Sequence, residues 1–219
     1  MIPLRDVIPS RTRPFVTVTL ILLNALLFLS SRLVPGLDDE LLRDTIALAG
    51  STWPAALVAM FLHGGWLHLA GNLLVLWIVG GNVEDRMGHG RYLVFYLLVG
   101  AAAAFAQMWH TPHPAPPPAG ASGAIAGLTG AYLVLFPTSR VLVLVPAWKA
   151  LDIIELPALI VLLLWLLIQI AAGFGGGTAA DGGAHWMLAG GFATGLALVW
   201  VFRRREREKV SWWSDSPKS

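Results

Sequence analysis

Long runs of apolar residues, separated by short polar or basic segments, dominate the pattern along this chain. A bilayer core of about 30 Å needs roughly 20 apolar residues for each helix that crosses it. Runs that approach this length occupy residues 14–33, 66–82, 91–109, 121–138, 154–173 and 184–202. The pattern therefore predicts an all-α polytopic membrane protein, built as a bundle of six transmembrane helices.

The composition agrees with a membrane protein and divides the chain into three parts. Of the 219 residues, 56% are hydrophobic and only 13% are charged, whereas a soluble domain carries about 25% charged residues. The chain contains no cysteine, so disulfides and thiol chemistry are excluded. We expect an N-terminal segment over residues 1–13, a membrane domain over 14–202 and a basic tail over 203–219.

The basic residues predict the orientation of the bundle, because lysine and arginine gather in cytoplasmic segments. Of the 15 basic residues, all but Arg32 and Arg43 lie before the first run, between runs two and three, between runs four and five, or after the last. Both termini are therefore expected in the cytoplasm. The run "RRREREK" is read as an orientation signal rather than a nucleic-acid site, because it follows a membrane span.

Polar residues mark the second, fourth and sixth runs, whereas the fifth is plainly aliphatic. With the orientation above, His68, Asn72, Ser122 and His185 all fall near the outer end of their spans. His68 and Asn72 are four residues apart, so both side chains lie on one helix face. Polar groups are costly toward lipid, so this face should look into the bundle. It can serve either a reaction or hydrogen bonding between helices.

Pairs of glycines in the fourth and sixth runs predict that these two helices pack closely. Gly123 and Gly127 are four residues apart, and so are Gly191 and Gly195. Small residues at this spacing allow helix backbones to approach each other. Close packing would bring a side chain of the sixth run toward Ser122, and a serine needs a neighbouring base to become a nucleophile.

Three stretches of the chain resemble the rhomboid family of intramembrane serine proteases. They are "FLHGGWLHLAGNLLVLWIVGGNVEDRMG", "GASGAIAGLTGAYLVLFP" and "GGFATGLALVWVFRRR". The resemblance implies a six-helix rhomboid-like fold with Ser122 as the nucleophile of a Ser–His dyad. It also implies that His68, Asn72 and the backbone N–H of Ser122 form the oxyanion hole, and that His63 has a supporting role.

The sixth run departs from the family pattern at the base. The family places its histidine three residues before the first packing glycine, and that position is Leu188 here. His185 lies three residues earlier, about 4.5 Å along the helix and about 60° around it. Three readings stay open: His185 is a displaced base, His68 acts as the base as well, or the protein is catalytically silent.

The resemblance implies that the partners are the lipid bilayer and transmembrane proteins whose spans are cleaved near the outer face. It also implies that the fifth span is a lateral gate. The first outer loop, over residues 34–55, is amphipathic and is expected to lie in the membrane interface. No nucleotide loop or metal-ligand cluster is visible, so no cofactor, metal or nucleic acid is expected. Two alternatives are a silent relative that binds client helices and a small channel or transporter.

Overall fold

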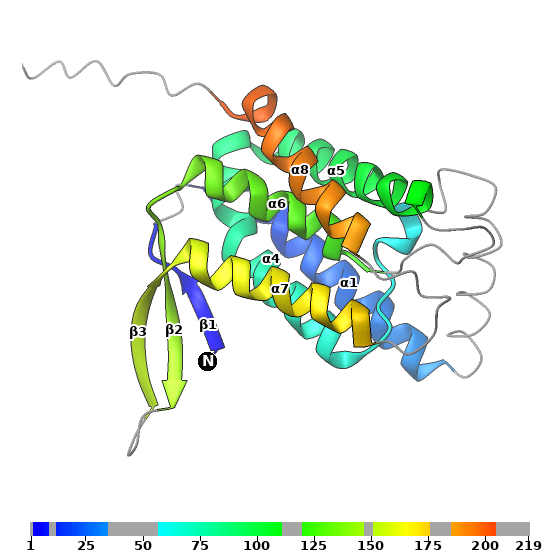
Figure 1. Cartoon of the computed structure of the whole chain (residues 1–219), viewed down its shortest axis with the longest axis horizontal. Coiled ribbons are helices and arrows are strands. Elements are labelled where there is room, and N and C mark those ends of the chain that lie inside the picture. The colour runs from blue at the N-terminus through cyan, green and yellow to red at the C-terminus, as the bar shows by residue number, and fades with distance from the viewer. Residues whose placement is uncertain are drawn as a thin grey trace, which may run out of the picture.

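A computed structural model describes residues 2–8, 12–34, 57–110, 120–146, 151–175 and 185–204. In this part of the chain the helices form one bundle, with a small sheet at one end (Figure 1). The helices are α1 (Phe15–Leu33), α4 (Trp66–Met87), α5 (His89–His110), α6 (Ser122–Leu135), α7 (Ala158–Gly175) and α8 (His185–Phe202). The strands are β1 (Ile2–Asp6), β2 (Arg140–Pro146) and β3 (Leu151–Pro157). Each of the six apolar runs therefore contains a helix.

The helices differ in length, and this difference decides which of them can span a bilayer alone. Within the described residues, α1, α4, α5 and α8 are long and apolar enough to cross a membrane, while α6 and the apolar part of α7 are shorter. With 14 residues, α6 extends about 21 Å, less than the roughly 30 Å of a bilayer core. The fourth apolar run was expected to form a helix as far as residue 138, whereas the helix ends at Leu135.

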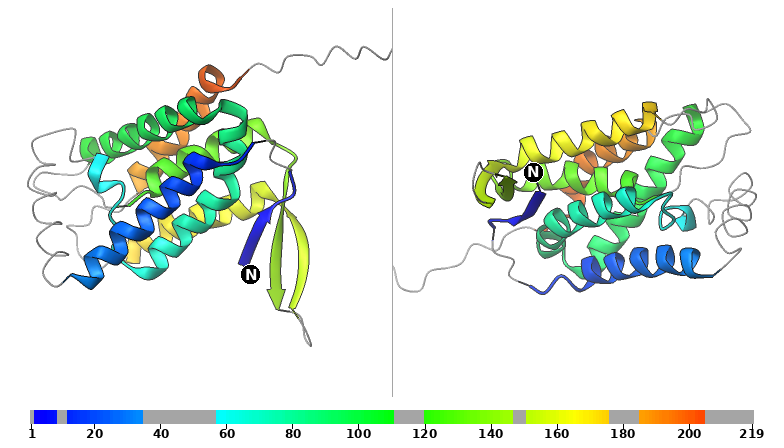
Figure 2. Two further views of the ribbon diagram at one scale, coloured as in Figure 1. Left: turned by 180° about the vertical axis from the view of Figure 1, so that it is seen from behind. Right: turned by 90° about the horizontal axis from the view of Figure 1, so that it is seen from below.

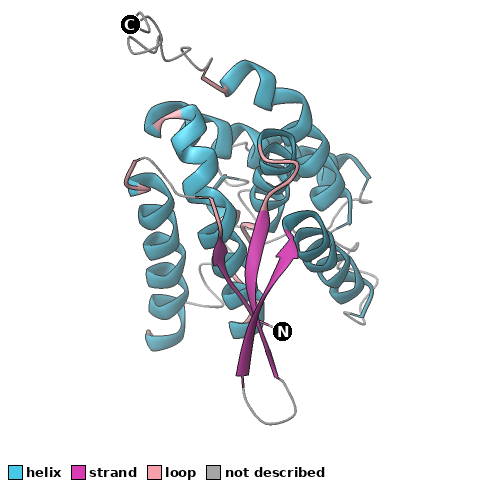
Figure 3. Cartoon of the chain, turned by 90° about the vertical axis from the view of Figure 1, so that its left-hand side faces the viewer, coloured by secondary structure: helices cyan, strands magenta, loops and turns pink. Residues whose placement is uncertain are grey.

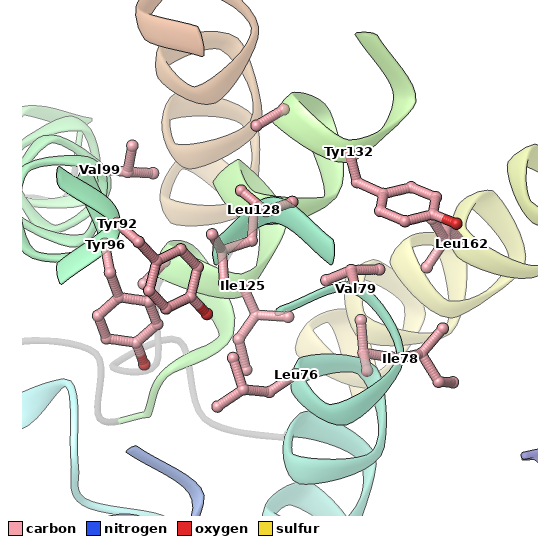
Figure 4. Packing of buried hydrophobic residues seen from close by; sticks show 14 of the residues in the cluster. Leu76, Ile78, Val79, Tyr92, Tyr96, Val99, Ile125, Leu128, Tyr132 and Leu162 are labelled. Atoms are coloured by element: carbon pink, nitrogen blue, oxygen red, sulfur yellow. The ribbon is translucent and has the colours of Figure 1, made fainter. Parts of the chain in front are cut away.

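The short helix α6 lies at the centre of the bundle. Every residue from Ser122 to Tyr132 is buried, which agrees with a composition too apolar and too rich in small residues for a surface helix. In Figure 4, Ile125 and Leu128 of α6 meet side chains from α4 and α5, among them Leu76 and Tyr92. The first residue of α6 is thereby held inside the protein.

A buried carboxylate joins α1 to α4, which lie side by side (Figure 2). Glu84 is fully buried and accepts hydrogen bonds from the backbone N–H groups of Val16 and Thr17, at 2.9 and 2.8 Å, and from the Thr17 hydroxyl at 2.7 Å. The first N–H groups of a helix have no partner within it, so Glu84 supplies what the N-terminus of α1 lacks. His89 at the start of α5 lies 2.6 Å from the same carboxylate.

The expectation of an all-α fold holds only in part, because the described residues are mostly helical but include an antiparallel sheet in the order β1-β2-β3 (Figure 3). Strand β2 reads "RVLVLVP" and β3 reads "LDIIELP", both rich in β-branched residues that suit a pleated surface. Residues 154–157 were expected in the fifth span, but α7 begins only at Ala158, directly after Pro157.

The N-terminal strand is fastened to the bundle through Asp6. The carboxylate of Asp6 accepts hydrogen bonds from the Tyr132 hydroxyl of α6 and, at 2.7 Å, from the Asn82 amide of α4. Strand β1 also pairs with β2, Asp6 lying opposite Val141. The segment 1–13 is therefore part of the folded structure at its described residues. We call this end of the bundle the sheet end, and the end at which α6 begins the serine end.

Two expectations fall largely outside the described residues. They concern the first outer loop and the basic tail beyond Arg204.

Candidate active site

Ser122 is the first residue of α6 and is 3% exposed. The turn that leads into it depends on Gly120, whose φ of +121° is a backbone conformation that favours glycine. The N–H of Gly120 donates to the carbonyl of Ala59 at 2.9 Å, so the segment before α4 holds this turn in place. The position of Ser122 is thus set by packing on both sides of the helix start.

His68, in the first turn of α4, lies directly against this turn. A Cβ placed on Gly120 would come within 2.7 Å of His68 Cε1 and 3.1 Å of its Nε2. Glycine therefore suits position 120 through its φ angle, and a Cβ there would force the ring of His68 to shift. His68 therefore lies against Gly120, which precedes Ser122 by two residues. The ring of His68 also lies 5.2 Å from the ring of His63.

A chain of hydrogen bonds runs from the segment before α4 into the centre of the bundle. His63 Nδ1 lies 3.3 Å from the carbonyl oxygen of Phe61, and His63 Nε2 lies 3.2 Å from Asn72 Nδ2. Asn72 Oδ1 in turn accepts a hydrogen bond of 2.9 Å from Gln169 Nε2 of α7. Asn72 is fully buried, so these contacts supply hydrogen-bond partners that it cannot obtain from water.

Burial and the nearby His68 hold the pKa of His63 well below its ordinary value of 6.5. The imidazole is therefore neutral at neutral pH. Because the Phe61 carbonyl can only accept, the proton of the neutral ring belongs on Nδ1, and Nε2 accepts from the Asn72 amide. The arrangement assigns His63 to orienting Asn72 rather than to carrying charge.

The glycines of α6 and α8 lie opposite one another, in two parallel helices that are side by side in Figures 1 and 2. A Cβ on Gly191 would come within 2.9 Å of the backbone of Gly123, and one on Gly195 would come within 2.6 Å of the backbone of Gly127. This register sets Gly191 level with Gly123, the residue that follows Ser122.

The same register shows how far Leu188 and His185, the two candidate positions for the base, lie from the level of Gly191. Leu188, one turn before Gly191, is 1% exposed, while His185 is the first residue of α8 and is half-buried. At about 1.5 Å per residue, Leu188 precedes Gly191 by about 4.5 Å and His185 precedes it by about 9 Å. Of these two positions, the leucine is therefore nearer to the level of the serine, and the histidine lies farther toward the start of the helix.

Two hydrogen bonds between helices were not predicted from the sequence. Gln169 lies in a run described above as plainly aliphatic, and a polar side chain inside such a run is itself a signal, because it must find a partner within the bundle. Gln107 of α5 accepts a hydrogen bond of 3.1 Å from the N–H of Met187 at the start of α8. The role of Gly120 could not be read from sequence, because it depends on the ring of His68.

Other features of the described residues lie apart from this site. A hollow of about 450 Å³, lined by Val7, Ile8 and residues 135–140, is at the sheet end, beyond the opposite end of α6 from Ser122. No group of three or more metal-ligating side chains occurs in the part of the chain that the structure describes.

Comparison with known proteins agrees with the resemblance noted in the sequence. The rhomboid domain model matches residues 50–205. The chain is 33% identical over 156 residues to "Rhomboid protease GluP" of Bacillus subtilis, covering 71% of this chain and 28% of that protein. "RHOMBOID-like protein 5" of Arabidopsis thaliana is 29% identical, over 71% of this chain and 46% of its own length. "Putative rhomboid protease YdcA" of Bacillus subtilis is 32% identical, over 56% and 64% respectively.

The matched region thus spans between about a quarter and a half of the length of the first two relatives. The match to the rhomboid domain model includes every candidate site residue, from His63 to Gly195. With its several membrane-spanning helices, the chain belongs to the rhomboid family.

Proposed function

We propose that this protein is an intramembrane serine endopeptidase that cleaves transmembrane segments of other membrane proteins. The observation that carries the proposal is the gathering of oriented polar groups at the start of α6. His68 lies against the turn before Ser122, and Asn72 is held by His63 and Gln169. Two relatives whose names include "rhomboid protease" support the same chemistry.

In the proposed reaction, Ser122 Oγ attacks a peptide carbonyl carbon of the substrate. The serine proton passes to a base and then to the leaving amine, and water hydrolyses the resulting acyl-enzyme. The negative charge on the carbonyl oxygen is met by the N–H of Ser122, one of the unpaired donors at a helix start. Asn72 supports this role because its amide carries two N–H groups and His63 uses one of them. His68 is the third donor.

The reaction also needs a base that accepts the proton of Ser122. We assign this role to His185, which lies at the start of α8, the helix that packs against α6. The distance along α8 estimated above requires a change at the helix start when substrate binds. His68 as base is the alternative within the same activity.

A second candidate function is a silent relative that captures client helices without cutting them. The specific observation in its favour is the buried Leu188 at the level where the family places its histidine. An apolar side chain there cannot take a proton from Ser122.

We further propose that the serine end faces outward and that the sheet end is cytoplasmic. Arg86, Arg140 and Arg204 lie at the sheet end, where the N–H of Arg204 donates to the carbonyl of Arg86 at 2.9 Å. Trp66 and Trp186, 63% and 46% exposed, stand at the serine end, as aromatic residues do at a membrane interface. Both termini are then cytoplasmic, in a bacterial inner membrane.

Labelling with a serine-directed fluorophosphonate tests the nucleophile. The purified protein in detergent should be labelled, and Ser122→Ala should abolish the label, while Ser139→Ala, which removes a buried serine at the sheet end, should retain it. If Ser122→Ala is labelled like the wild type, the assignment of Ser122 is wrong.

Two further variants distinguish an active protease with His185 as base from a catalytically silent protein. With His185 as base, His185→Ala loses cleavage of a membrane substrate by roughly 10²–10⁴-fold, and Leu188→His gives no gain. In a silent relative, the wild type is inactive and Leu188→His creates activity. Cleavage that is unchanged in His185→Ala would exclude His185 as the base.

A further inference from the structure

Gln169 is a polar side chain on a helix whose other described residues are almost all apolar. Its neighbours Leu167 and Ile168 are 61% and 58% exposed and face outward from the bundle. Gln169 itself is half-buried and donates from Nε2 to Asn72 Oδ1 at 2.9 Å. An amide in a membrane helix stays there at a free-energy cost unless it is paired, so this contact accounts for where the side chain points.

The carbonyl of Phe61 determines which group donates in each hydrogen bond of the series that runs through His63 and Asn72 to Gln169. The Phe61 carbonyl accepts, which places the His63 proton on Nδ1 and leaves Nε2 as an acceptor. Asn72 must then present its NH₂ group to His63, and its oxygen faces α7. That oxygen needs a donor, and the NH₂ group of Gln169 supplies it.

Gln169 is the donor at the α7 end of this series of hydrogen bonds, and its loss would leave Asn72 bonded only to His63. The oxygen of Asn72 would be buried without a partner, and the carboxamide would gain by rotating toward another donor. Such a rotation moves its NH₂ group, and the proposed oxyanion donor with it.

We propose that Gln169 is a positioning residue that fixes the amide orientation of Asn72 and makes that orientation depend on the packing of α7 against α4. The inference deepens the proposed function, since Asn72 is the oxyanion donor there, but the hydrogen-bond geometry stands without it. Gln169 acts through Asn72 and contacts no reacting atom.

The packing of α7 explains why a hydrogen bond is needed at this position. Near the sheet end, α7 is anchored by Ala158 and Leu162, which are 1% and 0% exposed. Farther along, none of the described α7 side chains is fully buried. The Gln169–Asn72 bond ties this less buried half of α7 to α4. If α7 moves away from α4 to admit a substrate, Asn72 loses the group that orients it.

The test combines a spectroscopic measurement with kinetics. Selective isotope labelling of asparagine gives side-chain amide signals from Asn24, Asn72 and Asn82, the asparagines of this chain, and Asn72→Ala identifies the relevant one. We expect a single sharp set of Asn72 signals in the wild type. In Gln169→Met, which keeps length but removes the donor, the Asn72 signals should split or broaden while those of Asn24 and Asn82 stay in place.

The matched control is Leu167→Val, which changes a side chain of α7 that is 61% exposed, leaves the hydrogen bond and the packing against α4 in place, and should keep the sharp Asn72 signals. Identical Asn72 signals in Gln169→Met and wild type would overturn the proposal, as would equal broadening in both variants. In the kinetic arm, kcat of Gln169→Met should fall about three- to tenfold, the scale of one hydrogen bond, with KM not raised. An unchanged kcat overturns the link to catalysis. A wild type without activity counts against the proposed function alone, because the spectra still decide the role of Gln169.

Discussion

The contact between α6 and α8 makes a quantitative prediction for Gly195→Ala. The added Cβ would lie 2.6 Å from the Cα and C atoms of Gly127 and closer still to its oxygen, whereas ordinary contacts of a Cβ begin at 3.4 Å. The two helices must therefore separate by at least about 0.8 Å. The obstacle is backbone and cannot rotate away, so the variant should lose stability near the upper end of the range of about 1–3 kcal/mol typical of overpacked cores.

A loss of about 2–3 kcal/mol corresponds to a decrease in Tm of roughly 4–12 °C for a chain of this size. Thermal unfolding in detergent measures it directly. The matched control is Gly90→Ala near the start of α5, where an added Cβ meets nothing within 4 Å. Alanine there should be neutral or stabilising by up to about 1 kcal/mol, because it reduces backbone freedom in the unfolded chain.

The comparison has a clear failing outcome. If Gly195→Ala and Gly90→Ala unfold at the same temperature, the close approach of α6 and α8 at Gly127 is wrong. Activity provides an independent reading, since a displacement of about 1 Å in a catalytic group can reduce a rate by about 10²-fold. Gly195→Ala should then lose turnover even in the fraction that stays folded.

Three further predictions concern other parts of the structure. Glu84→Leu should lower the free energy of unfolding by about 3–5 kcal/mol, because the N–H groups at the start of α1 and the Thr17 hydroxyl lose their acceptor; chemical unfolding in detergent measures this, and a wild-type midpoint would contradict it. Because the folded-state pKa of His63 is lowered, the unfolded chain binds a proton more readily below pH 6.5, so stability should decrease as pH falls from 6.5. The slope should flatten in His63→Phe, and an equal slope in both proteins would refute this cause. Tyr132→Phe should loosen β1 through loss of the hydrogen bond to Asp6, seen as faster proteolysis near the N-terminus with an unchanged Tm of the helix bundle.

The helices were predictable because each is encoded locally by its apolar residues, and all six runs contain one. The sheet was not, because β1 at residues 2–6 pairs with a partner more than 130 positions away, and a seven-residue apolar strand looks like the edge of a membrane span. Residue 154, assigned to the fifth span, lies in β3 for this reason.

The residues of the candidate site likewise fall into those that the sequence predicted and those that it did not. Ser122, His68 and Asn72 were singled out because polar residues are rare in apolar runs. The partners that orient them, Gln169 and Gly120, were missed, since their contribution depends on which atom of another helix they meet. Periodicity predicts the face of a helix, but not the donor and acceptor across it.

The pairing of β1 with β2 also has a consequence for biosynthesis. The first strand leaves the ribosome early, yet its partner follows about 134 residues later, which at 5–20 residues per second is a wait of roughly 7–27 s. During that interval α1, α4, α5 and α6 are made and inserted, while the N-terminal strand has no sheet to join. Completion of the sheet therefore requires an even number of membrane crossings between β1 and β2, since an odd number would leave the two strands on opposite sides of the bilayer.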